Sequence, residues 1–128
     1  MAKKKAWRLI FAEGLLVRYL SGEEIWDFRK LSPGSHEFRN GQIIEGHFLD
    51  GGMLLLEVLA DTKIKLFSEI YESEYRKWGV SSREEMMEQM RRYYPDLTGK
   101  DTAALNRCRL ARINNRPIAG PLPEGLIK

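Results

Sequence analysis

The sequence is poor in the residues that build disulfides and metal centres. It holds one cysteine, Cys108, and two histidines, His36 and His47. A single cysteine cannot form a disulfide within the chain and is typical of proteins from a reducing compartment, so we expect a cytoplasmic protein. Structural zinc sites usually combine several Cys and His ligands. Because the chain has no Cys pair, we expect no metal and no cofactor.

Long apolar runs are also missing. No stretch approaches the ~20 residues that a membrane-spanning helix needs. Lysines at positions 3–5 precede apolar residues, but Arg8 and Glu13 interrupt that run, which is unlike the apolar centre of a signal peptide. We therefore expect a protein without a membrane partner.

The familiar nucleotide-binding and hydrolase motifs are absent as well. The chain has no G-x-x-x-x-G-K-[ST] phosphate loop, no G-x-G-x-x-G after an expected strand and no G-x-S-x-G elbow. Their absence argues against P-loop nucleotide hydrolysis, Rossmann-type dinucleotide binding and α/β-hydrolase chemistry. Serine, histidine and aspartate occur, but no spacing places them in a catalytic triad.

The size and charge of the chain fit one small domain. A length of 128 residues with 43% hydrophobic residues suffices for one compact core, and we expect a monomer. The formal net charge of +3 permits polyanion binding without requiring it. Basic residues cluster near the two ends, as Lys3, Lys4, Lys5 and Arg8 and as Arg107, Arg109, Arg112 and Arg116. Chain ends often lie close together in a domain, which would join these clusters into one basic patch.

Hydrophobic alternation and turn signals divide the chain into short elements. Strands are predicted at residues 6–11, 25–30, 42–48, 53–60, 62–66 and 105–113, and helices at residues 12–20, 69–77 and 82–94. Three of the five prolines follow residue 113. We therefore expect one domain over residues 1–113 and an extended tail over residues 114–128.

The helix at residues 82–94 has the strongest signals. Either Ser81 with Glu84 or Ser82 with Glu85 supplies a capping box at its start, and Pro95 ends it. Its apolar stripe consists of Met86, Met87, Met90, Tyr93 and Tyr94. Such a stripe is typical of core packing rather than of a binding groove.

The stretch from residue 21 to residue 30 carries the most functional information. Side chains alternate along a strand, so Trp26 and Phe28 should face an apolar core, while Asp27 and Arg29 share the other face with Ile25. An arginine oriented by an aspartate can grip an anion or a base edge. The alternative is an ordinary ion pair on a half-buried strand.

This stretch resembles the signature G-x-K-x-x-E-x-R of the ASCH family (activating signal cointegrator homology). Gly22, Asp27 and Arg29 occupy the glycine, acidic and arginine positions, while Glu24 stands where the family usually has lysine. Further likenesses follow in the same order, as residues 63–70 resemble a strand leading into L-S-E-I, residues 78–85 resemble x-G-F-x-S-x-E-E, and residues 94–97 read Y-P-D-L. The resemblance implies an α+β fold, a small PUA-like β-barrel of five to six strands with two to three helices.

The resemblance also implies a ligand. ASCH and PUA-like domains are associated with RNA or modified nucleotides, bound in a cleft beside the barrel, which here would surround residues 22–29. The candidate binding residues are Arg18, Gly22, Glu24, Asp27, Arg29, Lys30 and Arg39. Arginine and lysine would contact phosphate, and Glu24 would accept a hydrogen bond from a base amino group.

Some members of the family are amidohydrolases that act on N4-acetylcytidine with a lysine, a threonine and a glutamate. Their lysine and threonine positions correspond to Glu24 and Asp27, and the glutamate position falls near Trp78 and Gly79, where no carboxylate stands. The amine and hydroxyl of that mechanism are therefore missing, and no catalytic residues are assigned. Two alternatives to plain RNA binding stay open, namely a hydrolase with a different catalytic set and a protein-interaction module.

Overall fold

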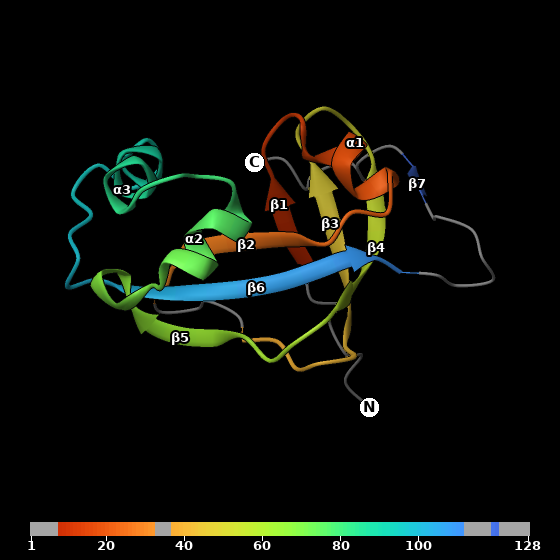
Figure 1. Ribbon diagram of the computed structural model, residues 1–128. Coiled ribbons are helices and arrows are strands. Elements are labelled where there is room, and N and C mark those ends of the chain that lie inside the picture. Colours follow the sequence, from red (N-terminus) through yellow and green to blue (C-terminus); the bar gives the residue numbers. More distant parts are fainter. Residues whose placement is uncertain (1–7, 33–36, 112–118, 121–128) are drawn as a thin grey trace.

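The computed structural model describes residues 8–32, 37–111 and 119–120, and it confirms an α+β fold in which a curled sheet forms a half-barrel flanked by three α-helices (Figure 1). The elements in chain order are β1 (Arg8–Phe11), α1 (Leu15–Leu20), β2 (Ile25–Lys30), β3 (Ile43–Phe48), β4 (Met53–Val58), β5 (Lys63–Leu66), the 3-10 turn η1 (Phe67–Glu69), α2 (Glu72–Trp78), α3 (Arg83–Arg91), β6 (Thr102–Leu110) and β7 (Ala119–Gly120).

The strand order explains why the barrel stays open. Neighbouring strands follow the path β1-β3-β4-β6-β2, with β5 paired to β6 and β7 paired to β4. The pair of β1 and β3 is parallel, and all other pairs are antiparallel. Strands β1 and β2 stand at the two ends of this path and do not pair with each other, so a seam runs between them.

One apolar cluster fills the inside of the curled sheet under α1. Its members are Leu9, Phe11, Tyr19, Ile25, Phe38, Ile44, Phe48, Leu54, Leu56, Val58 and Cys108. The rings of Phe11, Tyr19 and Phe48 pack together with centroids 5.2–5.7 Å apart. Cys108 is fully buried here, and burial raises the pKa of its thiol to about 12, so it is a packing residue rather than a thiolate.

A second apolar cluster lies on the opposite face of β2, under α2 and α3. Its buried members are Phe28, Phe67, Ile70, Tyr75, Val80, Met86, Met87, Met90, Leu97, Ala103 and Leu105, with Trp26, Trp78 and Tyr94 packed against them. Ile25 belongs to the first cluster and Phe28 to the second. The predicted alternation along β2 is therefore confirmed, and both faces of this strand are covered.

Several predicted boundaries differ from the structure, and those of β6 and α3 bear on the site. Strand β6 begins at Thr102 rather than at residue 105, because Ala103 and Ala104 are buried and pair with Lys30 and Arg29 of β2. Two alanines carry no alternation signal, so their pairing is set by tertiary contacts. Helix α3 begins after Ser82, one of the two predicted cap residues, and it ends at Arg91 rather than at residue 94.

The earlier end of α3 follows from Pro95. Proline disfavours the helical conformation of the residue before it, so the chain turns over Tyr93 and Tyr94 instead of continuing the helix. Of the predicted tail, only residues 119–120 are described, and they form β7 opposite Met53 and Leu54 of β4. The rest of the tail lies outside the described residues.

Helix α2 is fastened to β5 by a buried carboxylate. Glu74, whose side chain is only 4% exposed, accepts hydrogen bonds of 2.8 Å from Lys63 Nζ, Lys65 Nζ and the Tyr71 backbone N–H. Burial alone would raise the pKa of Glu74, but these three donors outweigh it and lower the pKa. The anchor matters for function because α2 ends at Trp78, which lines the cleft described below.

We expect Glu74→Gln to lower the free energy of unfolding by about 2–3 kcal/mol near pH 7, because it weakens charge-assisted hydrogen bonds around a buried group. A lowered pKa stabilises the fold above the pKa of the unfolded chain, 4.5 for this carboxyl, and the effect is lost as the pH falls below that value. Urea unfolding should therefore show the variant approaching wild type in acid. Glu72→Gln, which breaks only an exposed pair with Arg76, is the control and should stay within about 0.5 kcal/mol.

Candidate ligand-binding cleft at the barrel seam

Arg29 spans the seam between β1 and β2. Its Nη2 donates a hydrogen bond of 2.9 Å to the carbonyl oxygen of Ile10, and its Nε donates one of 2.8 Å to Oδ2 of Asp27. The guanidinium also lies over the ring of Phe11, 5.4 Å from the ring centroid. One side chain of β2 therefore holds the free edge of β1 in place.

A chain of hydrogen bonds through Asn106 and Thr62 orients the carboxylate of Asp27. Oδ2 of Asp27 also accepts from Nδ2 of Asn106 at 3.2 Å, and Asn106 is buried inside the half-barrel. Oδ1 of Asn106 accepts from the hydroxyl of Thr62 at 2.8 Å, which in turn accepts from the backbone N–H of Phe38 at 2.7 Å. Each donor in this relay has an acceptor, so the carboxylate is oriented by residues from three parts of the chain.

The Asp27–Arg29 pair is half-buried but reachable. The side chain of Arg29 is 31% exposed and that of Asp27 is 12% exposed. Burial alone would lower the pKa of Arg29, but the neighbouring Asp27 carboxylate outweighs it, so the pKa is raised and the guanidinium stays charged. No described residue bonds to Nη1 of Arg29 or to Oδ1 of Asp27. Among the described residues, one donor of Arg29 and one acceptor of Asp27 therefore have no partner.

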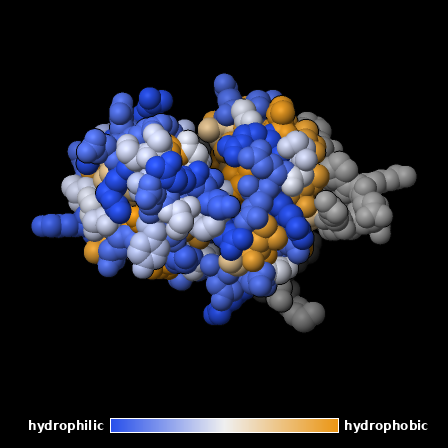
Figure 2. Space-filling view, viewed as in Figure 1, coloured by the Kyte–Doolittle hydropathy of each residue, from blue (hydrophilic) through white to orange (hydrophobic). Residues whose placement is uncertain are grey.

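The cleft beside this pair has an aromatic half of about 230 Å³. Its wall combines both ends of the seam with the helices and consists of Ile10, Phe11, Ala12, Leu15, Asp27, Phe28, Arg29, Trp78, Gln89, Met90, Tyr93 and Tyr94. The rings of Phe28 and Trp78 stack at 5.1 Å with an interplanar angle of 11°. In Figure 2 the surface shows a notch between the helical lobe and the barrel.

An adjoining basic half of about 320 Å³ lies on the other side of Arg29. It is lined by Arg8, Leu9, Ile10, Arg29, Lys30, Ser32, Tyr94, Ala104 and Asn106. The two halves share Ile10, Arg29 and Tyr94. The cleft therefore offers flat apolar surfaces on one side of Arg29 and positive charge on the other.

Three of the seven candidate binding residues line this cleft, namely Asp27, Arg29 and Lys30. Lys30 Nζ lies 4.0 Å from Asp101, a loose exposed pair that leaves most of its hydrogen-bonding capacity open.

The other four candidates do not line the cleft. Gly22 has a φ of 85° and ends α1, where its N–H bonds to Tyr19 and the N–H of the next residue bonds to Arg18, so its role is structural. The side chain of Arg18 is paired with Glu23 at 2.6 Å. Glu24 bonds to Arg107, and Arg39 is exposed outside the cleft.

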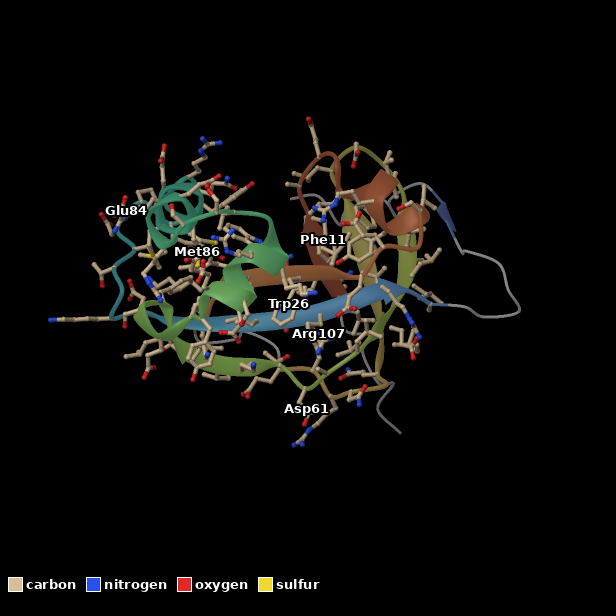
Figure 3. The ribbon with its side chains drawn as sticks, viewed as in Figure 1. Phe11, Trp26, Asp61, Glu84, Met86 and Arg107 are labelled. Atoms are coloured by element: carbon tan, nitrogen blue, oxygen red, sulfur yellow. The ribbon has the colours of Figure 1, made fainter. Side chains whose placement is uncertain are left out.

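Trp26 is half-buried and engaged by other side chains. Its ring packs edge-to-face on Phe28 on one side, and the guanidinium of Arg107 lies 5.0 Å from its centroid on the other. Glu24 holds that guanidinium with bonds of 2.6 and 2.8 Å, and Figure 3 shows Trp26 and Arg107 side by side. Arg109 is likewise paired, with Glu57 at 3.3 Å. These arginines are therefore neutralised, and the remaining end-cluster residues except Arg8 lie outside the described residues.

The aromatic wall of the cleft is not predicted by the sequence. The sequence predicts Tyr93 and Tyr94 as members of a core stripe. Tyr94 packs against the second apolar cluster, as predicted, but Tyr93 is 66% exposed at the rim of the cleft, so the prediction for Tyr93 is wrong. The three methionines of the stripe are buried as predicted. Pro95 is the sequence signal for this difference, because a helix that ends before it releases Tyr93 from the core-facing side, while Tyr94 stays packed against the second apolar cluster.

Comparison of the chain with models of protein families, with curated proteins and with solved structures returned no match. Within the described ranges no three His, Cys, Asp or Glu side chains are placed to hold a metal ion. No helix in the part of the chain that the structure covers is long and apolar enough to cross a membrane.

The two faces of β2 should differ in how much their side chains contribute to stability. We expect Phe28→Ala to lower the free energy of unfolding by about 3–5 kcal/mol, because it leaves a cavity in the second apolar cluster. The double variant Asp27→Ala/Arg29→Ala removes both partners and leaves no uncompensated charge, so it should lose only about 1–2 kcal/mol. Urea unfolding measures both. A double variant as unstable as Phe28→Ala would show that the pair is a buried structural bridge and not the centre of a site.

Proposed function

We propose that this protein is an RNA- or nucleotide-binding domain of the ASCH type, and that its ligand lies in the seam cleft around Asp27 and Arg29. The observation that carries the proposal is the position of Arg29. Its guanidinium is held by Asp27 and Ile10, has one nitrogen, Nη1, to which no described residue bonds, and separates an aromatic half of the cleft from a basic half.

The aromatic half suits an unpaired base. Single-stranded nucleic acids are bound by stacking bases on aromatic side chains and by hydrogen bonds to exposed base edges. Tyr93 offers an exposed ring at the rim, while Trp78 and Tyr94 extend the wall inward. The open donor of Arg29 and the open acceptor of Asp27 can meet a base edge that presents an acceptor beside a donor.

The basic half suits the phosphate. Arg8, Arg29 and Lys30 line it, and all three carry fixed positive charge near neutral pH. Arginine binds phosphate through its planar fork, and lysine acts as a point charge. Because β1, β2 and the turn after α3 each contribute a residue, base and phosphate contacts would be held by one rigid frame. We further place the protein in the cytoplasm as a monomer.

Direct titration tests this proposal. A fluorescent single-stranded RNA pool should bind the protein at low salt, with affinity falling as salt rises because counterions are released. Arg29→Ala should weaken binding about tenfold, and Tyr93→Ala should lose about 1–3 kcal/mol of stacking. Arg76→Ala is the matched control, because it removes the same charge from the exposed face of α2 and should change binding little. Equal losses for Arg29→Ala and Arg76→Ala, or no binding at low salt, would contradict the proposal.

The site argues for binding without deacetylation of N4-acetylcytidine. Glu24 is engaged with Arg107 outside the cleft, Oδ2 of Asp27 accepts from Arg29 and Asn106, and the third family position brings Trp78 instead of a carboxylate. We expect chromatography to recover the nucleoside intact after incubation with purified protein. Deacetylation that disappears in Asp27→Ala would instead reveal a carboxylate-based hydrolase in the same cleft.

A further inference from the structure

Gln89 brings a neutral polar side chain to the aromatic half of the cleft. It lies on α3 and lines the cleft together with Tyr93, which follows it by four residues. Its neighbours Met86 and Met90 are buried in the second apolar cluster, whereas Gln89 is half-buried and no described residue bonds to its amide. An amide carries both donors and an acceptor, so it can read a base edge that offers one of each.

Gln89 and Arg29 belong to different walls of the cleft. The guanidinium of Arg29 is held against β1 by its bond of 2.9 Å to the carbonyl oxygen of Ile10 and by its position over the ring of Phe11. Helix α3 belongs to the helical lobe on the other side of the notch (Figure 1, Figure 2). A flat ligand between these walls can therefore be read on two edges at once.

Among the standard bases, a purine has hydrogen-bonding groups on two separate edges. Besides its Watson–Crick edge it carries N7, next to the N6 amino group of adenine or the O6 atom of guanine. A pyrimidine has the carbons C5 and C6 at the corresponding place. An amide facing those carbons would be left without a partner, which costs free energy in a half-buried site.

The free groups of the cleft favour adenine over guanine. Oδ2 of Asp27 accepts from Arg29 and Asn106, so Oδ1 is the acceptor that is left. The adjacent N1–H and N2–H donors of guanine would need two acceptors, and its N7 and O6 would leave the amide oxygen of Gln89 without a donor. Adenine needs one donor at N1 and acceptors for its amino group, and an amide pairs with its N6 and N7 atoms.

We propose that the seam cleft selects adenine, with Gln89 bonded to N6 and N7 and with the free groups of Asp27 and Arg29 bonded to N6 and N1. Gln89 is then the residue that determines base specificity. This selection rests on the function proposed above, because it requires a base in the aromatic half. Stacking and phosphate contacts do not use Gln89, so its loss changes the choice of base more than the general affinity for RNA.

Fluorescence anisotropy with short oligoadenylate, oligocytidylate and oligouridylate measures the selection. The wild-type protein should bind oligoadenylate at least about tenfold more tightly than the other two, as expected for a bidentate amide contact. Gln89→Met keeps the length and helix propensity of the side chain and should lower this ratio to about two or less. Glu88→Met, on the exposed side of the same helix, is the matched control and should keep the ratio of wild type.

A change in the ligand tests the same contact in the wild-type protein, even if Gln89→Met is unstable. A deaza-adenine in which a C–H group replaces N7 keeps the N1 and N6 atoms. An oligonucleotide of this base should bind wild type about fivefold more weakly than oligoadenylate, because one hydrogen bond is lost. Gln89→Met should bind the two oligonucleotides equally.

The outcomes separate the selection of adenine from the proposed function. Binding that depends on Arg29 but is equally tight for all three oligonucleotides would overturn the selection and leave the proposed function intact. The same holds if wild type does not distinguish the deaza-adenine, or if the preference for adenine survives in Gln89→Met. Absence of binding to any of them at low salt would contradict the proposed function and the selection together.

Discussion

The guanidinium of Arg29 bridges the seam that the sheet leaves between β1 and β2. The barrel path ends in β1 and β2, which share no ladder, and Arg29 joins them by donating to Ile10 across the seam and to Asp27 on its own strand. A charge in this half-buried position persists because its counter-charge is two residues away and is itself oriented by Asn106. The shape of the cleft and the identity of its central donor therefore come from the same contact.

The position of Arg29 in turn depends on the way β2 is packed on both faces. One face completes the inside of the half-barrel, and the other lies under α2 and α3. A strand held by two cores cannot rotate or slip by one residue without exposing Ile25 or Phe28. This constraint fixes the directions of Asp27 and Arg29, while Glu74 fixes α2 on β5 and hence Trp78 against Phe28.

Local signals in the sequence were enough for most of the fold. The alternation of residues 25–30, the glycine after α1 and the serine cap before α3 each report a short-range preference that the tertiary structure keeps. The site was less accessible, because it depends on register between distant strands. Nothing near Asn106 or Thr62 in the sequence indicates that they meet Asp27, and Arg18 and Glu24 are close to the signature in sequence yet engage partners outside the cleft. The exposed side of Tyr93 became visible only once the turn at Pro95 was placed.

The nitrogens of Arg29 have different roles, and this makes the site preorganised. Its Nε and Nη2 are committed to the protein, so a ligand that uses Nη1 does not have to break the contact that holds β1. The guanidinium is also pinned over Phe11, which leaves little rotamer freedom to be lost on binding. A lysine at this position could supply charge, but it lacks the planar fork that bonds to β1, to Asp27 and to a ligand at once. Closing the barrel seam and, in the function proposed here, reading a ligand would therefore be two uses of one side chain, and the planar fork of arginine suits both.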